Sequence, residues 1–548
     1  MRRSIAALVT MTTAITVACA TEASCDGYCG TLVVLNSSDP NTVFQPRTSV
    51  IDEQPLVEQL FVRLAELTPD LETAGDSGFV PELASRWIRE DEVTLVFELN
   101  PAARWHDGSP LTAEDVVFTF EVYRDPEVSA TSAVLVERIE SVAARDDHTV
   151  VVRYTMPYLE QLYDVAHHLF ILPKHLLDTI PRGNIATHPL MTQHPIGAGP
   201  YRMERWGDDG TIELVADTNF FLGRPGIRRI VFRTVSDFGA KLTALASGDG
   251  DFVEFLGGLP AIERIEQSTQ ARVVSYASPV YNYLGFNFRS PADTTQPHPL
   301  FSDVRVRRAL SLLVDRAAVN DAVTGGHGMV AQSPMTPMIR LTSVAIPAYE
   351  QDTARALQLL RDAGWTDSNG DGVLDRNGRT FSFEMLYPST SGVRQTTAIS
   401  LEEMFRNAGL DVDVNAVDFS TYVEQQQSGS FDTFINSQFT TPSPSSVKTA
   451  WIAGATFNWG RYHNPRFEAA VKRFENATSP NDRQQALEDA FTTMHEDAAA
   501  IWLYYLNMNA GVHTRFENVS LRPDSWSVTV WQWRVRNGAW EPRDLVGN

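Results

Sequence analysis

Hydrophobic residues recur along this chain with two different periods, and each period predicts a different kind of element. Alternation rich in β-branched and aromatic residues predicts strands, and apolar residues three or four positions apart predict helices. Strands are predicted at residues 32–35, 94–99, 149–154, 281–287, 411–417 and 501–506, and helices at residues 55–67, 158–177 (broken near Pro173), 301–316, 396–408, 465–476 and 480–497. Strands and helices mix without strict alternation or a repeat, which predicts a mixed α/β fold and excludes solenoids and propellers.

One strand, one turn and one helix lie together in residues 87–123. The strand at residues 94–99 is followed by a turn at residues 106–108, where Asp and Gly tolerate the backbone angles that a turn needs. Thr112 precedes Asp115 by three residues, which predicts a capping box with Asp in place of the usual Glu. A strand, a turn and a capped helix occur together in many folds, so these elements alone predict no function.

The first 18 residues have the pattern of a secretory signal peptide. Arg2 and Arg3 precede an apolar run that ends at Ala18 and is too short to span a membrane as a helix. The residues at 16–18 resemble a lipoprotein cleavage site placed directly before Cys19. We therefore predict lipidation of Cys19, with ordinary secretion and nearby cleavage as the alternative. No later run is long and apolar enough to cross a bilayer.

All three cysteines precede residue 30. If Cys19 carries lipid, Cys25 and Cys29 remain in an oxidising compartment, where a small disulfide loop is expected. The alternative is two unpaired thiols in a tether at residues 19–29. The folded body therefore contains no cysteine, which excludes thiol catalysis and cysteine-ligated metals there.

Length and charge narrow the class of protein. A chain of 548 residues is too long for one core and predicts two or three domains. The net charge is −23, and removal of residues 1–18, which hold two arginines and no acid, brings it to −25. Such a surface repels phosphate backbones, so we expect no nucleic acid partner.

Catalytic motifs are missing from the sequence. It contains neither G-x-S-x-G nor a phosphate loop. His495-Glu496 begins like the zinc motif H-E-x-x-H, but Ala499 stands where the second His is needed. We therefore expect no catalytic activity of the kind found in a secreted hydrolase.

Two stretches resemble metal sites, and we expect neither to bind metal. His167 and His168 are adjacent, so they point to different faces of a helix. Residues 367–378 begin like a calcium-binding loop, but Gly378 stands where such a loop needs a bidentate Glu. We predict a solvent-exposed turn at residues 365–378.

The residue identities in residues 87–123 are more specific than the strand, turn and helix that they predict. It resembles the signature of the family 5 extracytoplasmic solute-binding proteins, the oligopeptide- and nickel-binding group that serves ABC importers. The matching residues are Trp87, Thr94, Phe97, Leu99, Trp105, Asp107, Gly108, Pro110, Thr112, Ala113, Asp115 and Val116. Further stretches similar to the family lie at residues 194–201 (with Ala198 for the usual Thr), 218–221, 245–251 and 301–316.

The resemblance implies an architecture of two α/β lobes around a ligand cleft, joined by crossing strands, with an extra domain inserted in the first lobe. After the signal peptide (1–18) and tether (19–29), we place the first lobe at residues 30–72, 190–284 and 503–548. The inserted domain then covers residues 73–189, and the second lobe covers residues 285–502.

The resemblance also implies a function and a location. Members capture a solute in the cleft and deliver it to the membrane permease subunits of an ABC importer, without a cofactor. We expect a monomer in the periplasm or cell envelope, bound to the membrane by its lipid anchor only.

The solute is predicted from cleft positions. Peptide-binding members hold the ligand's α-ammonium with acids, and the equivalent positions here are Phe44 and Thr441, with no acid from Thr433 to Ser446. A buried ammonium without a countercharge is costly. Peptide remains the first expectation, oligosaccharide the alternative, and nickel a more distant one. The residues predicted to contact the ligand are Phe44, Phe439, Thr441, Asn458, Trp459 and Asn507.

Overall fold

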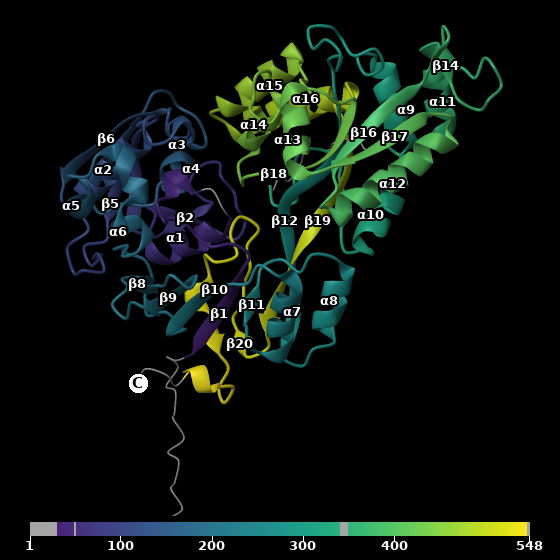
Figure 1. Ribbon diagram of the computed structural model, residues 1–548. Coiled ribbons are helices and arrows are strands. Elements are labelled where there is room, and N and C mark those ends of the chain that lie inside the picture. The colour runs from purple at the N-terminus through teal and green to yellow at the C-terminus, as the bar shows by residue number, and fades with distance from the viewer. Residues whose placement is uncertain (1–29, 49–50, 340–348, 545–548) are drawn as a thin grey trace, which may run out of the picture.

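The computed structural model describes residues 30–48, 51–339 and 349–544, and its centre is one mixed sheet of eleven strands (Figure 1). The strands lie in the order β17 (Asp411–Val417), β16 (Ser382–Pro388), β18 (Thr433–Phe439), β12 (Ala271–Phe286), β19 (Ala500–His513), β11 (Phe252–Val253), β1 (Thr31–Asn36), β10 (Arg229–Thr234), β9 (Thr211–Ala216) and β8 (Tyr201–Trp206), and β13 (Met329–Val330) pairs with β19.

Strands β12 and β19 connect two halves of the molecule (Figure 1). They pair antiparallel from Ala271 opposite His513 to Gly285 opposite Ala500, and the register shifts between Ala277 and Tyr281. Pro279 lies inside this shift and has no backbone N–H to donate, which accounts for a bulge at this point. The two long strands therefore form the crossing that the family resemblance implies.

The first half surrounds β1, which pairs parallel with β10 and with β11. Helices α7 (Phe238–Ser247) and α8 (Leu259–Glu266) cover it, and their apolar residues form a core with Val33 and Leu35 of β1. α7 ends at Gly248, whose φ of +87° is a left-handed conformation that glycine adopts without strain. This Gly belongs to the family-like stretch at residues 245–251, so that part of the resemblance has a structural cause.

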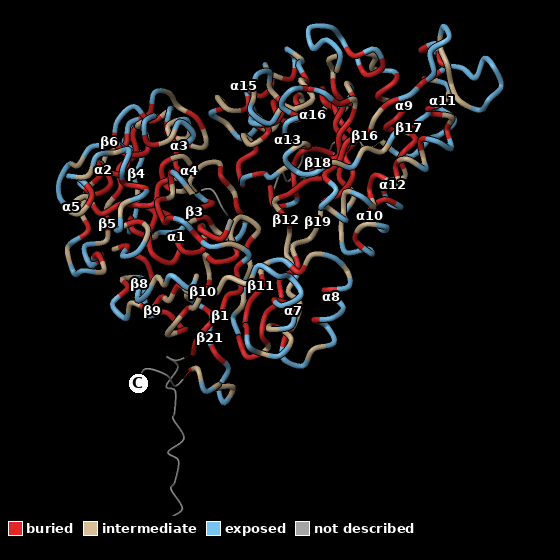
Figure 2. The backbone as a smooth tube through the Cα atoms, viewed as in Figure 1, coloured by how far each residue is buried: buried red, intermediate tan, exposed pale blue. Residues whose placement is uncertain are grey.

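The second half surrounds β16, which pairs parallel with β17 and with β18. An apolar core lies between these strands and the first four helices of this half, and Figure 2 shows buried residues gathered there. The helices are α9 (Val304–Leu313), α10 (Arg316–Thr324), α11 (Thr353–Asp362), α12 (Gly392–Asn407), α13 (Phe419–Ser428), α14 (Lys448–Trp451), α15 (Pro465–Glu475) and α16 (Pro480–Glu496).

The inserted domain is built on a separate four-stranded antiparallel sheet. Its strands lie in the order β4 (Ala84–Asp91), β5 (Thr94–Leu99), β7 (Thr149–Tyr154) and β6 (Ile139–Asp146), and its helices are α2 (Ala113–Tyr123), α3 (Ala130–Leu135), α4 (Gln161–Ala166), α5 (Lys174–Leu177) and α6 (Pro189–Thr192). The remaining short elements of the described chain are α1 (Gln54–Leu60), β2 (Ala65–Leu67), β3 (Phe79–Pro81), β14 (Asp375–Arg376), β15 (Arg379–Thr380), β20 (Phe516–Glu517), β21 (Arg534–Val535), η1 (Gln45–Arg47), η2 (Ile51–Glu53), η3 (Arg182–Thr187), η4 (Pro444–Val447), η5 (Val530–Gln532) and η6 (Pro542–Asp544).

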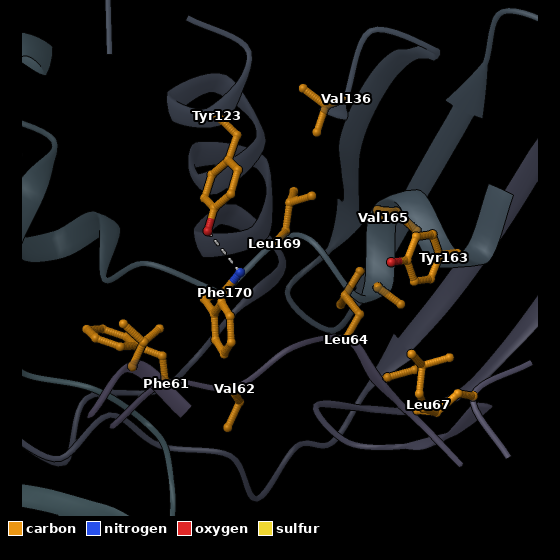
Figure 3. Close-up of a cluster of buried hydrophobic side chains, with 14 of the residues drawn as sticks. Phe61, Val62, Leu64, Leu67, Tyr123, Val136, Tyr163, Val165, Leu169 and Phe170 are labelled. Atoms are coloured by element: carbon orange, nitrogen blue, oxygen red, sulfur yellow. Dashed lines mark hydrogen bonds between the residues drawn. The ribbon is translucent and has the colours of Figure 1, made fainter. Parts of the chain in front are cut away.

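A shared apolar cluster ties the inserted domain to the first half (Figure 3). Phe61, Leu64 and Leu67 of the segment around β2 pack there with Tyr123 and Phe170 of the inserted domain. The Tyr123 hydroxyl accepts a hydrogen bond from the Phe170 backbone N–H at 3.2 Å. Because the core is continuous here, the domain boundaries drawn from the sequence stay a prediction.

The signature residues Trp105, Thr112 and Asp115 meet at the start of α2. One oxygen of the Asp115 carboxylate accepts from the Thr112 backbone N–H at 2.9 Å and from the Trp105 indole N–H at 3.4 Å. The other oxygen accepts from the backbone N–H of Lys174 at 2.9 Å. The predicted helix start is therefore confirmed, and Asp115 also joins three segments.

The glycines of the stretch at residues 194–201 let two backbones approach closely. Gly199 donates its N–H to the Leu60 carbonyl at 2.8 Å, and a Cβ on Gly197 would lie 1.7 Å from that oxygen. The Gly197 carbonyl accepts from the backbone N–H of His106. This stretch therefore has a structural role.

The structure confirms the mixed α/β fold class and differs from several predicted element boundaries. The helix predicted at residues 55–67 ends at Leu60, and Leu64 and Leu67 belong instead to the segment that enters the inserted domain. The helix predicted at residues 301–316 is α9, which ends at Leu313, and Asp315 caps a second helix, α10, that begins at Arg316. Residues 167–173, inside the helix predicted at 158–177, lie between α4 and α5.

Candidate functional site

A cavity of about 900 Å³ lies between the inserted domain and the second half of the sheet, and we call it the larger cavity. The inserted domain contributes residues from the end of α3 to β6 and from the segment at 158–168. The second half contributes residues of α13 and β18 and the loops at 439–449 and 456–459. A volume of this size is typical of ligand sites in proteins.

Apolar side chains that are unusually exposed gather around the larger cavity. Val134, Phe419, Phe439 and Phe457 are 55%, 57%, 61% and 42% exposed, and all four line it. Half-buried Trp459 lies beside Phe457, with ring centroids 5.9 Å apart. Large apolar groups around a concave surface are a mark of a binding site, because covering them on binding is favourable.

Neutral polar groups lie between these apolar side chains. Gln438, Thr441 and Ser446 line the larger cavity, and the buried Ser446 hydroxyl has no hydrogen-bond partner among the described residues. A buried hydroxyl left without a partner costs free energy, which a ligand can recover by forming the hydrogen bond. The cavity therefore suits a ligand that is partly apolar and also carries hydrogen-bonding groups.

Most charges of the larger cavity are paired or neutralised. Lys448 donates to Glu475 at 2.8 Å. Burial raises the pKa of Asp164 to about 8, although the Tyr158 hydroxyl donates to its carboxylate at 2.6 Å. Arg394 lies over the Tyr422 ring at 5.6 Å and forms no ion pair within the described part of the chain.

Glu160 of the inserted domain holds the wall of the larger cavity to the second half. Its carboxylate accepts from the hydroxyls of Ser443 at 2.8 Å and Ser445 at 3.0 Å. It also pairs with Arg483 of α16 at 2.7 Å, and both side chains are largely buried. The loop at 439–449 is therefore fixed to the inserted domain as well as to the second half in this conformation.

A second cavity of about 300 Å³, the smaller cavity, adjoins the first half. Phe439, Thr440 and Thr441 line both cavities, so one loop separates them. The other walls of the smaller cavity include Tyr276 and Met508 of the crossing strands. Together the two cavities form a cleft bordered by both halves of the sheet and by the inserted domain.

The smaller cavity also contains acidic groups. Asp524 pairs with Arg522, which in turn pairs with Glu66 at 2.9 Å. Glu254 follows β11, and burial together with the nearby carboxylate of Asp52 raises its pKa to about 7. The cleft therefore holds a carboxylate that the sequence analysis did not single out.

The paired histidines lie between the cavities without forming a metal site. Burial and the nearby Arg63 lower the pKa of His168 to about 4, and burial holds the pKa of His167 well below its usual range. The His167 ring stacks on Tyr163 with centroids 4.9 Å apart. Across residues 30–48, 51–339 and 349–544, no three His, Cys, Asp or Glu side chains gather as metal ligands would.

The sequence profile of the bacterial extracellular solute-binding proteins, family 5, matches residues 78–459. The match covers well over half of the chain and includes the inserted domain, β12, β18 and most of the loops around the larger cavity. The chain belongs to family 5. Members of this family are non-enzymatic carriers that serve ABC importers, which confirms the prediction of a binding protein rather than an enzyme.

Several family 5 proteins are similar over most of their length. The oligopeptide-binding protein AppA of Bacillus subtilis is 28% identical over 459 residues, which cover 81% of this chain and 82% of AppA. The nickel-binding periplasmic protein of Escherichia coli is 22% identical, with 85% of this chain and 88% of that protein covered. The family name supports a location in the cell envelope.

Solved structures show the same fold. The structure of AppA from Bacillus subtilis in complex with a nonapeptide has a TM-score of 0.74 at 24% identity and covers 92% of this chain and 99% of that one. The substrate-binding protein CtaP from Listeria monocytogenes has a TM-score of 0.81 at 21% identity, with the same shares covered. Within the described residues, no helix combines the length and apolar character that crossing a bilayer requires.

The structure brings three of the six predicted contact residues to the cleft. Phe439 and Thr441 line both cavities, and Trp459 lines the larger one. Their contact with a ligand stays a prediction. Cys19, the predicted lipidation site, and the pair Cys25 and Cys29 lie outside the described residues.

The other three predicted contact residues lie elsewhere. Phe44 is fully buried in the apolar core and lines neither cavity. The Asn458 side chain donates to the carbonyls of Ile452 and Tyr462, at 2.9 and 2.8 Å, so its amide holds its own loop. Asn507 pairs with Ala277 in the crossing strands and also lines neither cavity.

Sequence reasoning missed the contribution of the inserted domain. Arg138, Tyr158, Glu160 and Asp164 line the larger cavity, but they come from segments in which no motif stood out. The adjacent pair at residues 167–168 was the one signal in that region, and it suggested metal. Only the folded chain brings these residues opposite the loop at 439–449.

Proposed function

We propose that this chain captures a peptide in the cleft between its lobes and delivers it to the membrane permease of an ABC importer. The observation that carries the proposal is the lining of the larger cavity, where exposed apolar side chains alternate with neutral hydrogen-bonding groups. A peptide offers both kinds of group, because its side chains can cover apolar surface while its backbone forms hydrogen bonds. The relative AppA, which its name describes as oligopeptide-binding, supports this class of ligand.

The mechanism is a shift between open and closed forms. Groups from the inserted domain and from the second half both face the larger cavity. A ligand therefore gains all its contacts only when the inserted domain and the second half are close together. Binding then favours the closed form by the difference between the ligand's affinities for the two forms. The permease subunits recognise that form, and no cofactor takes part.

A thermal-shift screen tests the proposal. The mature chain is heated with libraries of short peptides and with oligosaccharides, and its unfolding temperature is recorded. A peptide at 100 times its Kd adds about 2.7 kcal/mol to the free energy of unfolding, which gives a clear rise in unfolding temperature. Stabilisation by oligosaccharides alone would overturn the peptide proposal.

Oligosaccharide remains the second candidate because of the aromatic side chains. Phe419, Phe439, Phe457 and Trp459 offer flat apolar faces of the kind that stack on sugar rings. The same faces also accept the side chains of a peptide, and the screen separates the two ligand classes directly.

We further propose that the mature chain is anchored to the membrane through lipid on Cys19. The support is the apolar run that ends directly before the cleavage-like residues at 16–18. A Cys19→Ser variant should move from the membrane fraction to the soluble fraction when cells are lysed without detergent. Equal fractionation of the variant and the unmodified chain would contradict this anchor.

A further inference from the structure

We propose that a third cavity, which lies outside the ligand cleft, binds a small organic ammonium ion. This cavity has a volume of about 420 Å³, and its walls include residues of the segments 58–69, 80–82, 220–222 and 520–532. It shares no lining residue with the larger cavity and only Arg522 with the smaller one. The inference therefore concerns a separate site and goes beyond the proposed peptide function.

Aromatic side chains line the third cavity on several sides. They are Phe61, Phe170, Phe220 and Trp531, and Figure 3 shows Phe61 and Phe170 within the apolar cluster of the first half. The rings of Phe220 and Trp531 meet edge to face, with centroids 5.7 Å apart. The Arg63 guanidinium already lies 4.1 Å from the centroid of the Phe170 ring. Because the face of an aromatic ring attracts positive charge, these walls favour a cationic ligand.

The two arginines of the third cavity are already paired with acids. Glu66 accepts from the Arg63 guanidinium at 2.5 Å and from the Arg522 guanidinium at 2.9 Å. Arg522 also pairs with Asp524, and Arg63 lies 3.5 Å from the Glu58 carboxylate. These pairs leave no excess positive charge that would attract an anion or repel a cation.

Glu82 is the carboxyl group that remains for a ligand. It follows β3 and lines the third cavity. One of its oxygens accepts from the Arg63 backbone N–H at 3.1 Å, and it forms no ion pair within residues 30–48, 51–339 and 349–544. Burial and the nearby carboxylate of Glu66 raise the pKa of Glu82 to about 8, so a proton neutralises it near pH 7. A ligand cation can take over this role, because an opposite charge stabilises the ionised carboxylate.

A buried donor next to Glu82 offers the ligand a second polar contact. Arg63 is 4% exposed, and its Nε has no hydrogen-bond partner among the described residues. A ligand oxygen that accepts from this N–H would recover the cost of the missing hydrogen bond. Val80 and Leu222, which are 43% and 38% exposed, give apolar substituents a surface to cover. The cavity therefore fits an ammonium ion that carries apolar substituents and one oxygen, and choline is a probe with this combination.

The experiment is calorimetric titration of the full mature chain with choline chloride, with sodium chloride as the control for ionic strength. The second probe is the neutral analogue of choline in which carbon replaces the ammonium nitrogen. We expect choline to bind at least about tenfold more tightly than this analogue, because only choline has the charge that the aromatic faces and Glu82 attract. Equal binding of the two probes, or no binding of choline, would overturn the proposal.

Two variants locate the site. Glu82→Gln, which keeps the shape of the side chain, should weaken choline at least about tenfold and leave the neutral analogue unchanged. Trp531→Leu keeps an apolar side chain but removes an aromatic face, and it should weaken choline about two- to fivefold. The matched control is Glu92→Gln, since Glu92 is an exposed acid of the inserted domain that lines none of the three cavities. If choline binds both variants as tightly as the unmodified chain, the third cavity is not its site.

A pH series gives an independent readout, because choline keeps its charge at every pH. The charged groups that face Glu82 are Arg63, Glu58 and Glu66, and Arg522 lies beyond Glu66. As the pH rises from 7 to 9, Glu82 loses its proton, so the affinity for choline should rise in the unmodified chain and stay level in the Glu82→Gln variant. The same rise in both proteins would assign the titration to another group, such as Glu58, and contradict the role of Glu82.

Discussion

Trp459 illustrates how the same residue type serves the core and the cleft. Eleven tryptophans occur in the chain, and several, such as Trp105, Trp365 and Trp533, are fully buried. Trp459 instead is half-buried and lines the larger cavity beside Phe457. Composition and periodicity cannot separate these cases, because burial depends on contacts between segments far apart in the sequence.

Replacement of Trp459 by Ala should weaken the best ligand of the screen by about 1–3 kcal/mol, which is typical of losing an aromatic anchor. The reason is the lost apolar contact in the larger cavity, and calorimetric titration measures it. Phe238→Ala is the control, since Phe238 is 38% exposed and lines neither cavity. Equal affinity of the Trp459→Ala variant and the unmodified chain would exclude Trp459 from the site.

Asp164 makes stability depend on pH. Its pKa is about 8 in the folded chain, mainly because of burial, against an ordinary value of 3.8. Between pH 4 and pH 8 the folded chain therefore holds a proton that the unfolded chain has lost. The free energy of unfolding then falls as the pH rises through this window.

The Asp164→Asn variant should lose this part of the pH dependence and gain stability relative to the unmodified chain as the pH approaches 8. Unfolding temperatures measured from pH 5 to pH 8.5 test this, and the difference between the two proteins isolates Asp164 from other carboxyls. Asp178→Asn, which changes an exposed acid of the same domain, serves as the control. Parallel curves for the Asp164→Asn variant and the unmodified chain would contradict the raised pKa.

At the scale of elements, local signals predicted six of the strands, while others, such as β16 and β18, were not predicted. The strands at 94–99, 149–154 and 411–417 have the predicted bounds, because alternation and flanking turn residues are local properties. The crossing strands were predicted too short, at 281–287 and 501–506, since Pro279 interrupts the pattern of β12 and Asn507 and Asn509 interrupt that of β19. Pairing along the whole length of the two strands overrides these local interruptions.

The predicted cap of α2 gives a test at this scale. Asp115 is buried, and its carboxylate is the acceptor for the backbone N–H groups of Thr112 and Lys174. Asp115→Ala should lower the free energy of unfolding by about 2 kcal/mol or more, because a cap is lost and buried donors are left without a partner. Scanning calorimetry measures the shift.

The control for this variant lies in the same helical turn. Glu114 is exposed and forms a surface ion pair with the Lys174 ammonium at 2.7 Å, which contributes little to stability. Glu114→Ala should therefore change the unfolding temperature only slightly. A similarly small effect of Asp115→Ala would show that the cap does not hold the segments together.

At the scale of the whole molecule, the cleft depends on segments that the sequence keeps apart. Glu254, Phe439 and Asp524 meet at the smaller cavity from positions up to 270 residues distant from one another. The family resemblance predicted the two halves and the crossing strands, because members of one family share a fold. It did not predict the side chains of the cleft, since three of the six predicted contact residues lie away from both cavities.

In the proposed closure, the inserted domain takes part through Glu160. This carboxylate binds Ser443, Ser445 and Arg483, all of the second half, and Arg138 adds a hydrogen bond to the Glu475 carbonyl at 2.9 Å. These contacts exist only while the inserted domain and the second half are close together. They therefore stabilise the same conformation that a ligand in the larger cavity favours, and the two effects are coupled.

Glu160→Gln should shift the chain toward an open form, because the variant leaves the largely buried Arg483 without its main countercharge. We expect the radius of gyration of the ligand-free variant, measured by small-angle X-ray scattering, to increase, and the affinity for the best peptide to fall about tenfold, which corresponds to about 1.4 kcal/mol. Asp489→Asn is the matched control, since it breaks an exposed ion pair with Arg473 between α15 and α16, within the second half. Excess ligand should restore the compact form of the variant, as expected if ligand and Glu160 favour one closed state. An unchanged radius and an unchanged affinity would show that closure does not depend on this contact.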